Sequence, residues 1–320
     1  MYLRKLLLVA FFAIETKMRR RDDFYNFCYW QTVDKCLILK HNMNMKSKSL
    51  LILLCFYTVF AFAQEHFIVM SYNIRYDNAG DGINKWSNRK ENLIKLIIAH
   101  HPAIIGTQEV LVNQLNDLNS GLINYESIGV GRDDGKQKGE YAAIFFDKTI
   151  FTKLDGGNFW LSETPEIAGS KSWDAALTRI ATWVKLKHSK SGKIIYVFNT
   201  HFDHVGKVAR EKSALLIKEK IKLIAGNNNY ILIGDLNTEP SEEAYQYLMN
   251  TGDQLFNDAA GTDNKEATFC GFETANKNCK RIDYILYSKK LKTKNYLVIH
   301  ENDGKYYPSD HLPIISEIAF

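Results

Sequence analysis

The sequence predicts an α/β fold, in which short buried strands alternate with amphipathic helices. Apolar runs with the length and branching of buried strands recur along the chain, and most end in polar or turn-forming residues. Between them lie segments whose apolar residues are spaced to form one helix face. Hydrophobic residues make up 46% and charged residues 24% of the 320 residues. This is the balance of a globular protein.

The beginning of the chain has a different character. Met45 to Lys48 is a short basic segment, an apolar run follows, and Ala61-Phe62-Ala63 closes it. These are the three parts of a secretory signal peptide, so we predict a signal over 45–63 with cleavage after Ala63. The run is too short for a comfortable membrane span. Residues 1–44 are interpreted as an upstream extension, with translation starting at Met45 or Met43.

The charge of the chain depends on this division. Residues 1–63 hold ten of the 41 Lys and Arg and four of the 36 Asp and Glu, so residues 64–320 carry 31 bases and 32 acids. We expect 64–320 to be a single, monomeric domain exported to the periplasm or the extracellular space, without a stable membrane span. Its near-neutral charge does not favour tight, non-specific binding of nucleic acid.

Strand and helix signals alternate in the first half of the chain. Asn73 stands near the end of the first predicted strand, and Glu109 near the end of the second. In chain order we predict a strand over 67–75, a loop to Trp86, a helix that ends before Pro102, a strand over 103–110, a helix over 112–118 and a strand over 140–146.

The second half opens with a predicted hairpin between 178–186 and 193–199, and His201 follows it directly. We then predict an amphipathic helix over 208–224, a strand before Gly234, a helix over 241–248, strands over 281–287 and 314–319, and loops over 159–168 and 253–268.

The stretch Tyr230 to Pro240, YILIGDLNTEP, shows a recurring plan. Apolar residues run into Gly234, and Asp235 and Asn237 then follow two residues apart, so that both side chains can point to the same side. Gly, Asp and Asn are also ordinary turn residues, and a simple turn explains this stretch taken alone.

Polar residues of this kind recur at the other predicted strands: Asn73, Glu109, His201, Asp283, Asp310 and His311. Turn chemistry does not explain this regularity, whereas an active site at one rim of stacked sheets requires it. His201 has an alternative interpretation, as a ligand of a zinc site together with Asp203 and His204. Cys270 and Cys279 flank a loop and are either a disulfide or two free thiols.

Taken together, SYNIR, TQE, THFDH, GDLN, RIDYIL and SDHLPI resemble the motifs of the endonuclease/exonuclease/phosphatase family of metal-dependent hydrolases. Their order and spacing match over about residues 66 to 320. The resemblance implies a four-layer α/β sandwich, with two mixed β-sheets packed face to face and helices outside. It also implies an enzyme that hydrolyses phosphoric ester bonds.

The resemblance assigns a metal site and a base. Glu109 matches the principal Mg²⁺ ligand, and Asn73 and Asp310 match neighbouring metal-site residues. Mg²⁺ takes a few carboxylate oxygens and keeps waters, and Mn²⁺ is a second cation to test. Asp235 matches the aspartate that orients or deprotonates the attacking water.

The resemblance also assigns contacts to the substrate phosphate. Asn237, Arg179 and His311 match phosphate-binding residues, with Asp283 as the partner of His311, and Asn73 also belongs to this set. His201 matches a second histidine of the deoxyribonuclease-type branch, with Glu140 as its partner. We expect each carboxylate to raise the pKa of its imidazole and to favour the cation.

Arg75 departs from the pattern, because abasic-site endonucleases carry an acid at this position. A cation cannot bind metal there and is expected to meet phosphate. We predict an exported Mg²⁺-dependent phosphoesterase that cleaves a phosphodiester or a phosphomonoester by in-line attack of water. The alternatives are an extracellular nuclease acting on DNA or RNA, and a non-catalytic module that binds a phosphate ligand on the same fold.

Overall fold

The computed structural model describes residues 65–250, 255–261 and 264–320. The predicted signal peptide and upstream extension lie outside these residues. Within the described ranges, no helix has the length and apolar character needed to cross a membrane.

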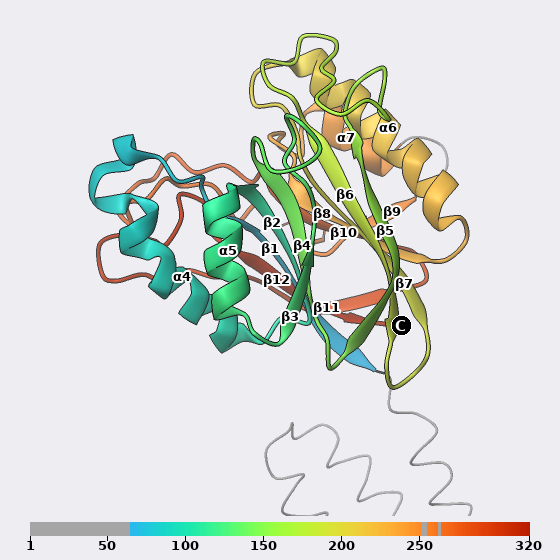
Figure 1. The fold of residues 1–320 in the computed structure, drawn as a ribbon, viewed down its shortest axis with the longest axis horizontal. Coiled ribbons are helices and arrows are strands. Elements are labelled where there is room, and N and C mark those ends of the chain that lie inside the picture. The colour runs from blue at the N-terminus through green and yellow to red at the C-terminus, as the bar shows by residue number, and fades with distance from the viewer. Residues whose placement is uncertain (1–64, 251–254, 262–263) are drawn as a thin grey trace, which may run out of the picture. The chain divides into compact units, whose positions relative to one another are not determined.

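Two six-stranded sheets lie face to face in the middle of the domain (Figure 1). In spatial order, the first sheet consists of β11 (Lys292–Val298), β12 (Ile314–Ala319), β1 (His66–Asn73), β2 (Ile104–Val110), β4 (Tyr141–Asp147) and β3 (Tyr125–Ile128). The second consists of β5 (Phe151–Trp160), β6 (Ile180–His188), β7 (Ile194–His201), β8 (Asn229–Asp235), β10 (Asp283–Ser288) and β9 (Phe256–Asp258).

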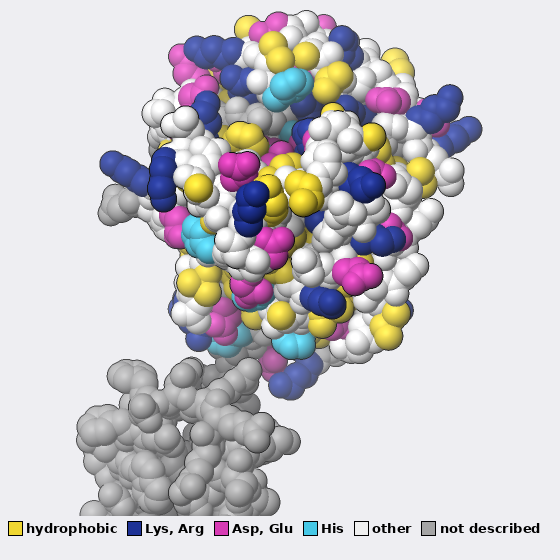
Figure 2. All heavy atoms as spheres, turned by 90° about the vertical axis from the view of Figure 1, so that its left-hand side faces the viewer, with side chains coloured by type: hydrophobic (Ala, Val, Ile, Leu, Met, Phe, Trp, Pro, Cys, Tyr) yellow, Lys and Arg dark blue, Asp and Glu magenta, His cyan; other side chains and the backbone are white. Residues whose placement is uncertain are grey.

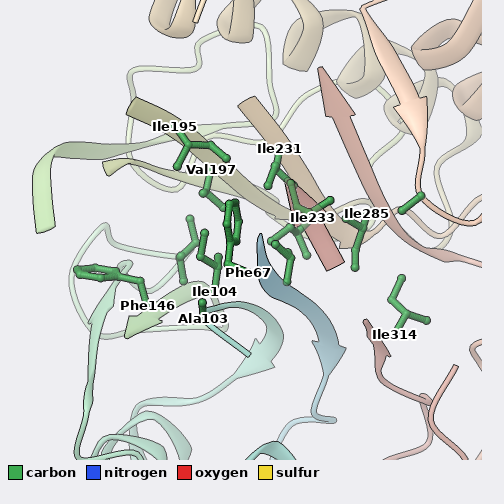
Figure 3. Packing of buried hydrophobic residues seen from close by; sticks show 14 of the residues in the cluster. Phe67, Ala103, Ile104, Phe146, Ile195, Val197, Ile231, Ile233, Ile285 and Ile314 are labelled. Carbon is green, nitrogen blue, oxygen red and sulfur yellow. The ribbon is translucent and has the colours of Figure 1, made fainter. Parts of the chain in front are cut away.

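Apolar side chains of both sheets interlock to form the central core (Figure 3). Phe67, Ile104 and Phe146 come from the first sheet, and Val197 and Ile231 from the second. All five are almost completely excluded from water. Side chains alternate along a strand, so each sheet has a second apolar face that needs its own cover.

Helices cover both outer faces (Figure 1). The helices α4 (Trp86–His100) and α5 (Val112–Gly121) pack on the first sheet, and α6 (Lys207–Ala225) and α7 (Glu243–Asn250) pack on the second. A short 3₁₀ segment, η2 (Ala79–Asn84), precedes α4. The predicted four-layer α/β sandwich is therefore confirmed.

Four strands were not predicted, and all four are sheet edges: β3 and β11 in the first sheet, β5 and β9 in the second. Two predicted loops need correction for this reason. Phe159 and Trp160, assigned to a loop, are the last residues of β5, and the loop over 253–268 contains β9.

The strand directions bring the polar strand ends to one rim. β1 and β2 run parallel, as do β7 and β8, so their carboxyl ends meet there. Asp235 is in register with His201 on one side and with Asp283 on the other. Gly234 permits this close approach, because a Cβ at this position would lie 2.3 Å from the Thr200 carbonyl oxygen.

Cys270 and Cys279 form a disulfide, which resolves the two alternatives left by the sequence. The N–H groups of Cys270 and Gly271 donate to the Asp310 carbonyl at 3.2 and 2.9 Å. The disulfide loop therefore supports the segment that carries Asp310 and His311.

Replacing both cysteines with serine should lower the free energy of unfolding by about 2–3 kcal/mol, because the cross-link closes a short loop in the unfolded chain. Urea denaturation at pH 7 measures this change. A reducing agent should produce the same shift in the wild type and none in the double variant. Equal stability of the two proteins would contradict the assignment.

Candidate active site

Asp235 is the centre of the site. Its Oδ2 accepts a hydrogen bond from Asn73 Nδ2 at 3.0 Å and lies 3.4 Å from His201 Nε2 and 3.6 Å from His311 Nε2. Its Oδ1 accepts from the Asn237 N–H at 2.9 Å. Burial raises the pKa of Asp235 to about 7 with a contribution from the Asp283 carboxylate, although His311 opposes the shift. A carboxylate with a pKa near neutrality suits a group that takes a proton from water.

His311 and Asp283 form the predicted pair. His311 Nδ1 lies 2.9 Å from Asp283 Oδ2, and that oxygen also accepts from the Thr268 hydroxyl at 2.6 Å. Burial disfavours the imidazolium, but Asp283 and Asp235 outweigh it and raise the pKa of His311 to about 10. His311 is therefore a cation near neutral pH, as expected.

Glu109 is aimed into the site by an irregular backbone. The register between β2 and β4 shifts after Thr107, which marks a β-bulge, and Glu109 itself has a φ of 62°. A positive φ is rare for a residue with a side chain and is often found at functional positions. Glu109 Oε1 accepts from Asn73 Nδ2 at 3.1 Å, so a single amide joins Glu109 to Asp235.

Glu109 and Asp310 lie on either side of the Arg75 guanidinium. Arg75 Nη1 is 3.9 Å from Glu109 Oε2, and Arg75 Nε is 4.0 Å from Asp310 Oδ2. Arg75 also makes a bidentate pair with Asp81, at 3.0 Å for both bonds. Three carboxylates therefore surround this cation, and the expectation that Arg75 meets phosphate stays a prediction.

The donors at Glu109 and Asp310 fit a hard divalent cation. Both carboxylates are only partly buried, and oxygen ligands of this kind suit Mg²⁺. Burial raises the pKa of Asp310, and the neighbouring Glu109 carboxylate adds to this effect. A bound cation would offset that repulsion. The amide of Asn73 lies next to Glu109, and its role as a ligand stays a prediction.

A second group has metal-ligand geometry among the described residues. Asp235, Asp283 and His311 each offer a ligand atom, and these atoms lie within 4.8 Å of one another. The Asp283 carboxylate and His311 Nδ1 already bind each other. The oxygen-rich pair Glu109 and Asp310 stays the predicted site for a magnesium-like ion, because carboxylate oxygens suit that ion better than an imidazole.

His201 differs from the prediction in its charge and its partner. Its Nε2 lies 2.9 Å from Asn237 Nδ2, whereas its Nδ1 lies 3.9 Å from Glu140 Oε2 and makes no hydrogen bond. Burial and the cations Arg179 and Arg132 lower the pKa of His201 well below its usual value. The predicted increase is therefore wrong, because burial and the two arginine cations dominate and Glu140 binds Arg132 at 2.5 Å instead.

Arg179 lies close to His201 and is held by other residues. Its Nε is 3.4 Å from Asp203 Oδ2, and its Nη2 is 3.0 Å from His204 Nδ1. Asp203 also accepts backbone N–H bonds from Ala176, Leu177, Val205 and Gly206. Asp203 and His204 thus share the Arg179 guanidinium, whereas His201 contacts Asn237. A cation already held between two of the three residues argues against the zinc alternative. The phosphate contact of Arg179 stays a prediction.

Two arginines of the site were missed in the sequence. Arg132 lies in the glycine-rich segment between Gly129 and Gly139 and binds Glu140. Arg89 on α4 is buried and donates to the carbonyls of Arg75 and Pro308 at 2.6 and 3.1 Å, so it ties together the segments that carry Arg75 and Asp310. The charged character of the glycine-rich segment was the only local signal for Arg132.

Residues 70–311 match the Endonuclease/Exonuclease/phosphatase family. This match spans most of the chain, and the fold and the site agree with it. The chain therefore belongs to the endonuclease/exonuclease/phosphatase family, whose members are metal-dependent hydrolases of phosphoester bonds.

Solved structures of bacterial family members are similar along their whole length. An endonuclease/exonuclease/phosphatase from Bacteroides vulgatus is 40% identical with a TM-score of 0.76, and the alignment covers 80% of this chain and 99% of that one. A mannosyl-6-phosphatase from Bacteroides thetaiotaomicron is 36% identical with a TM-score of 0.74, and the alignment covers 79% of this chain and 100% of that one.

A relative found by sequence is the uncharacterized protein L388 of Acanthamoeba polyphaga mimivirus. It is 27% identical over 251 residues, and the alignment covers 73% of this chain and 92% of that protein.

The Asp203→Asn variant should be less stable at neutral pH. Burial opposes the charge of Asp203, but the four backbone N–H groups lower its pKa far below the unfolded value near 3.9. Its contribution is therefore present above about pH 4 and is lost as the pH falls further. We expect the variant to lose about 2–3 kcal/mol of unfolding free energy at pH 7.

Urea denaturation at pH 7 and pH 3 tests this expectation, and the difference between variant and wild type should shrink at the lower pH. Asp155→Asn is the control, because Asp155 is an exposed carboxylate on β5. A loss that is independent of pH would contradict the role given to the Asp203 charge.

Proposed function

We propose that this protein is an exported, Mg²⁺-dependent phosphoesterase whose substrate is a phosphomonoester, with a sugar phosphate as the first candidate. The observation that carries the reaction is the position of Asp235. Its carboxylate is buried between the Asn73 amide, which also contacts Glu109, and the imidazoles of His201 and His311. This arrangement supports the proposed roles of Asp235 as the base, His311 as a cationic donor and Glu109 as a metal-binding carboxylate.

Glu109 and Asp310 would hold the metal, with Asn73 beside them. When bound, a divalent cation would stabilise the charge that develops on the phosphoryl oxygens. The remaining steps, activation of the water and stabilisation of the oxyanion, are assigned to side chains of this protein. Asp235 orients a water and takes its proton, and the Asn237 N–H and the Asn73 amide hold its carboxylate in place. The His311 cation, oriented by Asp283, donates to the developing oxyanion.

A sugar phosphate is favoured over nucleic acid as the substrate. The mannosyl-6-phosphatase from Bacteroides thetaiotaomicron resembles this chain over 79% of its length. Residues 64–320 are close to neutral in charge. On the face over α4 and α5, basic side chains are interspersed with acidic ones (Figure 2). Strong binding of a polyanion requires a basic surface along its path, which supports a small substrate.

Glu109→Ala should reduce turnover by at least about a thousandfold while the fold is kept, because it removes a carboxylate from the metal site. Glu126→Ala is the matched control, since Glu126 is exposed on the edge strand β3. Activity with added Mg²⁺ and thermal unfolding are measured for both. Wild-type activity in Glu109→Ala would refute the metal assignment.

A substrate panel tests the proposed reaction. Purified residues 64–320 are assayed with Mg²⁺ or Mn²⁺ against mannose 6-phosphate, inositol phosphates, 4-nitrophenyl phosphoesters, a phospholipid, DNA and RNA. We expect the highest kcat/KM with phosphomonoesters and loss of activity in EDTA. Faster cleavage of DNA or RNA would favour the nuclease alternative. No turnover of any substrate would favour the non-catalytic binding module.

Export and a monomeric state are part of the proposal. The disulfide supports export, because disulfides persist in oxidising compartments. N-terminal sequencing of the native protein should begin at Gln64, and a sequence beginning at Met1 would contradict both the signal peptide and the start at Met45. Size-exclusion chromatography with light scattering should give the mass of one chain.

A further inference from the structure

Three buried donors beside the catalytic rim have no hydrogen-bond partner. They are Arg132 Nε, Arg179 Nη1 and His201 Nδ1, and His201 Nδ1 carries the proton in the tautomer whose Nε2 accepts from the Asn237 amide. These residues are 8%, 4% and 8% exposed, respectively. A buried N–H without an acceptor is costly, so a group of such donors indicates a ligand with acceptor atoms.

Glu140 and Asp203 hold these side chains without satisfying them. Glu140 Oε2 accepts from Arg132 Nη1 at 2.5 Å and lies 3.9 Å from His201 Nδ1. Asp203 Oδ2 lies 3.4 Å from Arg179 Nε. Asp133 Oδ1, at 3.8 Å, is too far from Arg132 Nε for a hydrogen bond. Each arginine is thus held by a carboxylate, and Arg179 also by His204 Nδ1, while each keeps a buried nitrogen without a partner.

The two guanidinium groups also repel each other. Burial lowers the pKa of Arg179, and the neighbouring Arg132 adds to this effect. Both arginines act in the same direction on His201. An anion placed between them would relieve the repulsion and accept the free N–H groups, and charge-assisted bonds of this type are strong.

The backbone holds Arg132 in place before any ligand binds. The Arg132 N–H donates to the Glu140 carbonyl at 3.1 Å, and the Arg132 carbonyl accepts from Trp160 Nε1 at 2.6 Å. The loop beyond it is closed by Asp134 Oδ1, which accepts from the N–H groups of Lys136 and Lys138 at 2.8 and 3.0 Å. A preorganised guanidinium loses little freedom on binding.

We propose that Arg132 determines specificity for phosphomonoesters, by binding the phosphoryl oxygens of the substrate together with Arg179 and His201. The inference rests on the proposed function and deepens it. A phosphomonoester has three non-bridging oxygens and a charge close to −2 at neutral pH, whereas a phosphodiester has two such oxygens and a charge of −1. Three free donors and a second buried cation match the monoester.

The test compares a monoester with a diester in the same variants. We measure kcat/KM with Mg²⁺ for 4-nitrophenyl phosphate and for bis(4-nitrophenyl) phosphate. Arg132→Gln should lower the monoester-to-diester ratio by about ten- to a hundredfold, because it removes a charge-assisted contact to the dianion. Arg132→Lys should lower this ratio less, since it keeps the charge but loses the guanidinium fork.

Arg281→Gln is the matched control. Arg281 is 4% exposed, and its Nη2 pairs with Asp258 at 2.5 Å, as Arg132 pairs with Glu140. Its loss should lower stability but leave the ratio unchanged. A purely structural role for Arg132 would lower kcat/KM equally for both esters and would overturn the proposal. If Arg132→Gln does not fold, Arg132→Lys makes the same comparison.

A binding measurement separates this inference from the proposed function. Inorganic phosphate should raise the melting temperature of the wild type in EDTA, and the increase should be about half or less in Arg132→Gln. If the wild type cleaves neither ester, the proposed function fails and this thermal shift still decides the role of Arg132. Equal increases in melting temperature in the wild type and Arg132→Gln would overturn the proposed role of Arg132 in binding phosphate.

Discussion

The buried carboxylate of Asp235 is the group on which the rest of the site depends. Removing a carboxylate from water is costly unless hydrogen bonds and opposite charges replace the water. Asn73 reaches it from the first sheet, the Asn237 N–H from its own turn, and the His311 cation from the segment before β12. The two sheets must pack in one register to bring these groups together, so the packing of the core and the geometry of the site are a single constraint.

The same rim contains three residues in a backbone conformation that residues other than glycine rarely adopt. Arg75, Glu109 and Asn237 all have positive φ values, at 57°, 62° and 45°. Such strain persists only where the surroundings fix the conformation. Here the ends of β1, β2 and β8 are held by buried strands, and Arg89 and Gln114 bind the Arg75 carbonyl. The rigid core therefore permits the strained ends that aim functional side chains.

The predicted strands were the inner ones, and the missed strands were the edges. An inner strand is covered on both faces and on both sides, so it appears as a continuous apolar run such as Tyr230 to Ile233. An edge strand has one open side and more exposed residues. In β5, the residues from Thr152 to Asp155 are exposed, and in β11 four of the seven residues are exposed. Their strand conformation comes from pairing with a neighbour, which no local pattern records.

The sequence by itself determined the family, the succession of the inner strands along the chain and the set of polar residues at their ends. These features depend on local spacing and residue type. The tertiary structure decided how those residues pair and which of them are charged. His201 loses its expected carboxylate partner to Arg132, and Arg75 lies among carboxylates. These outcomes depend on burial and on charges from distant parts of the chain. Such contacts exist only once the two sheets have packed.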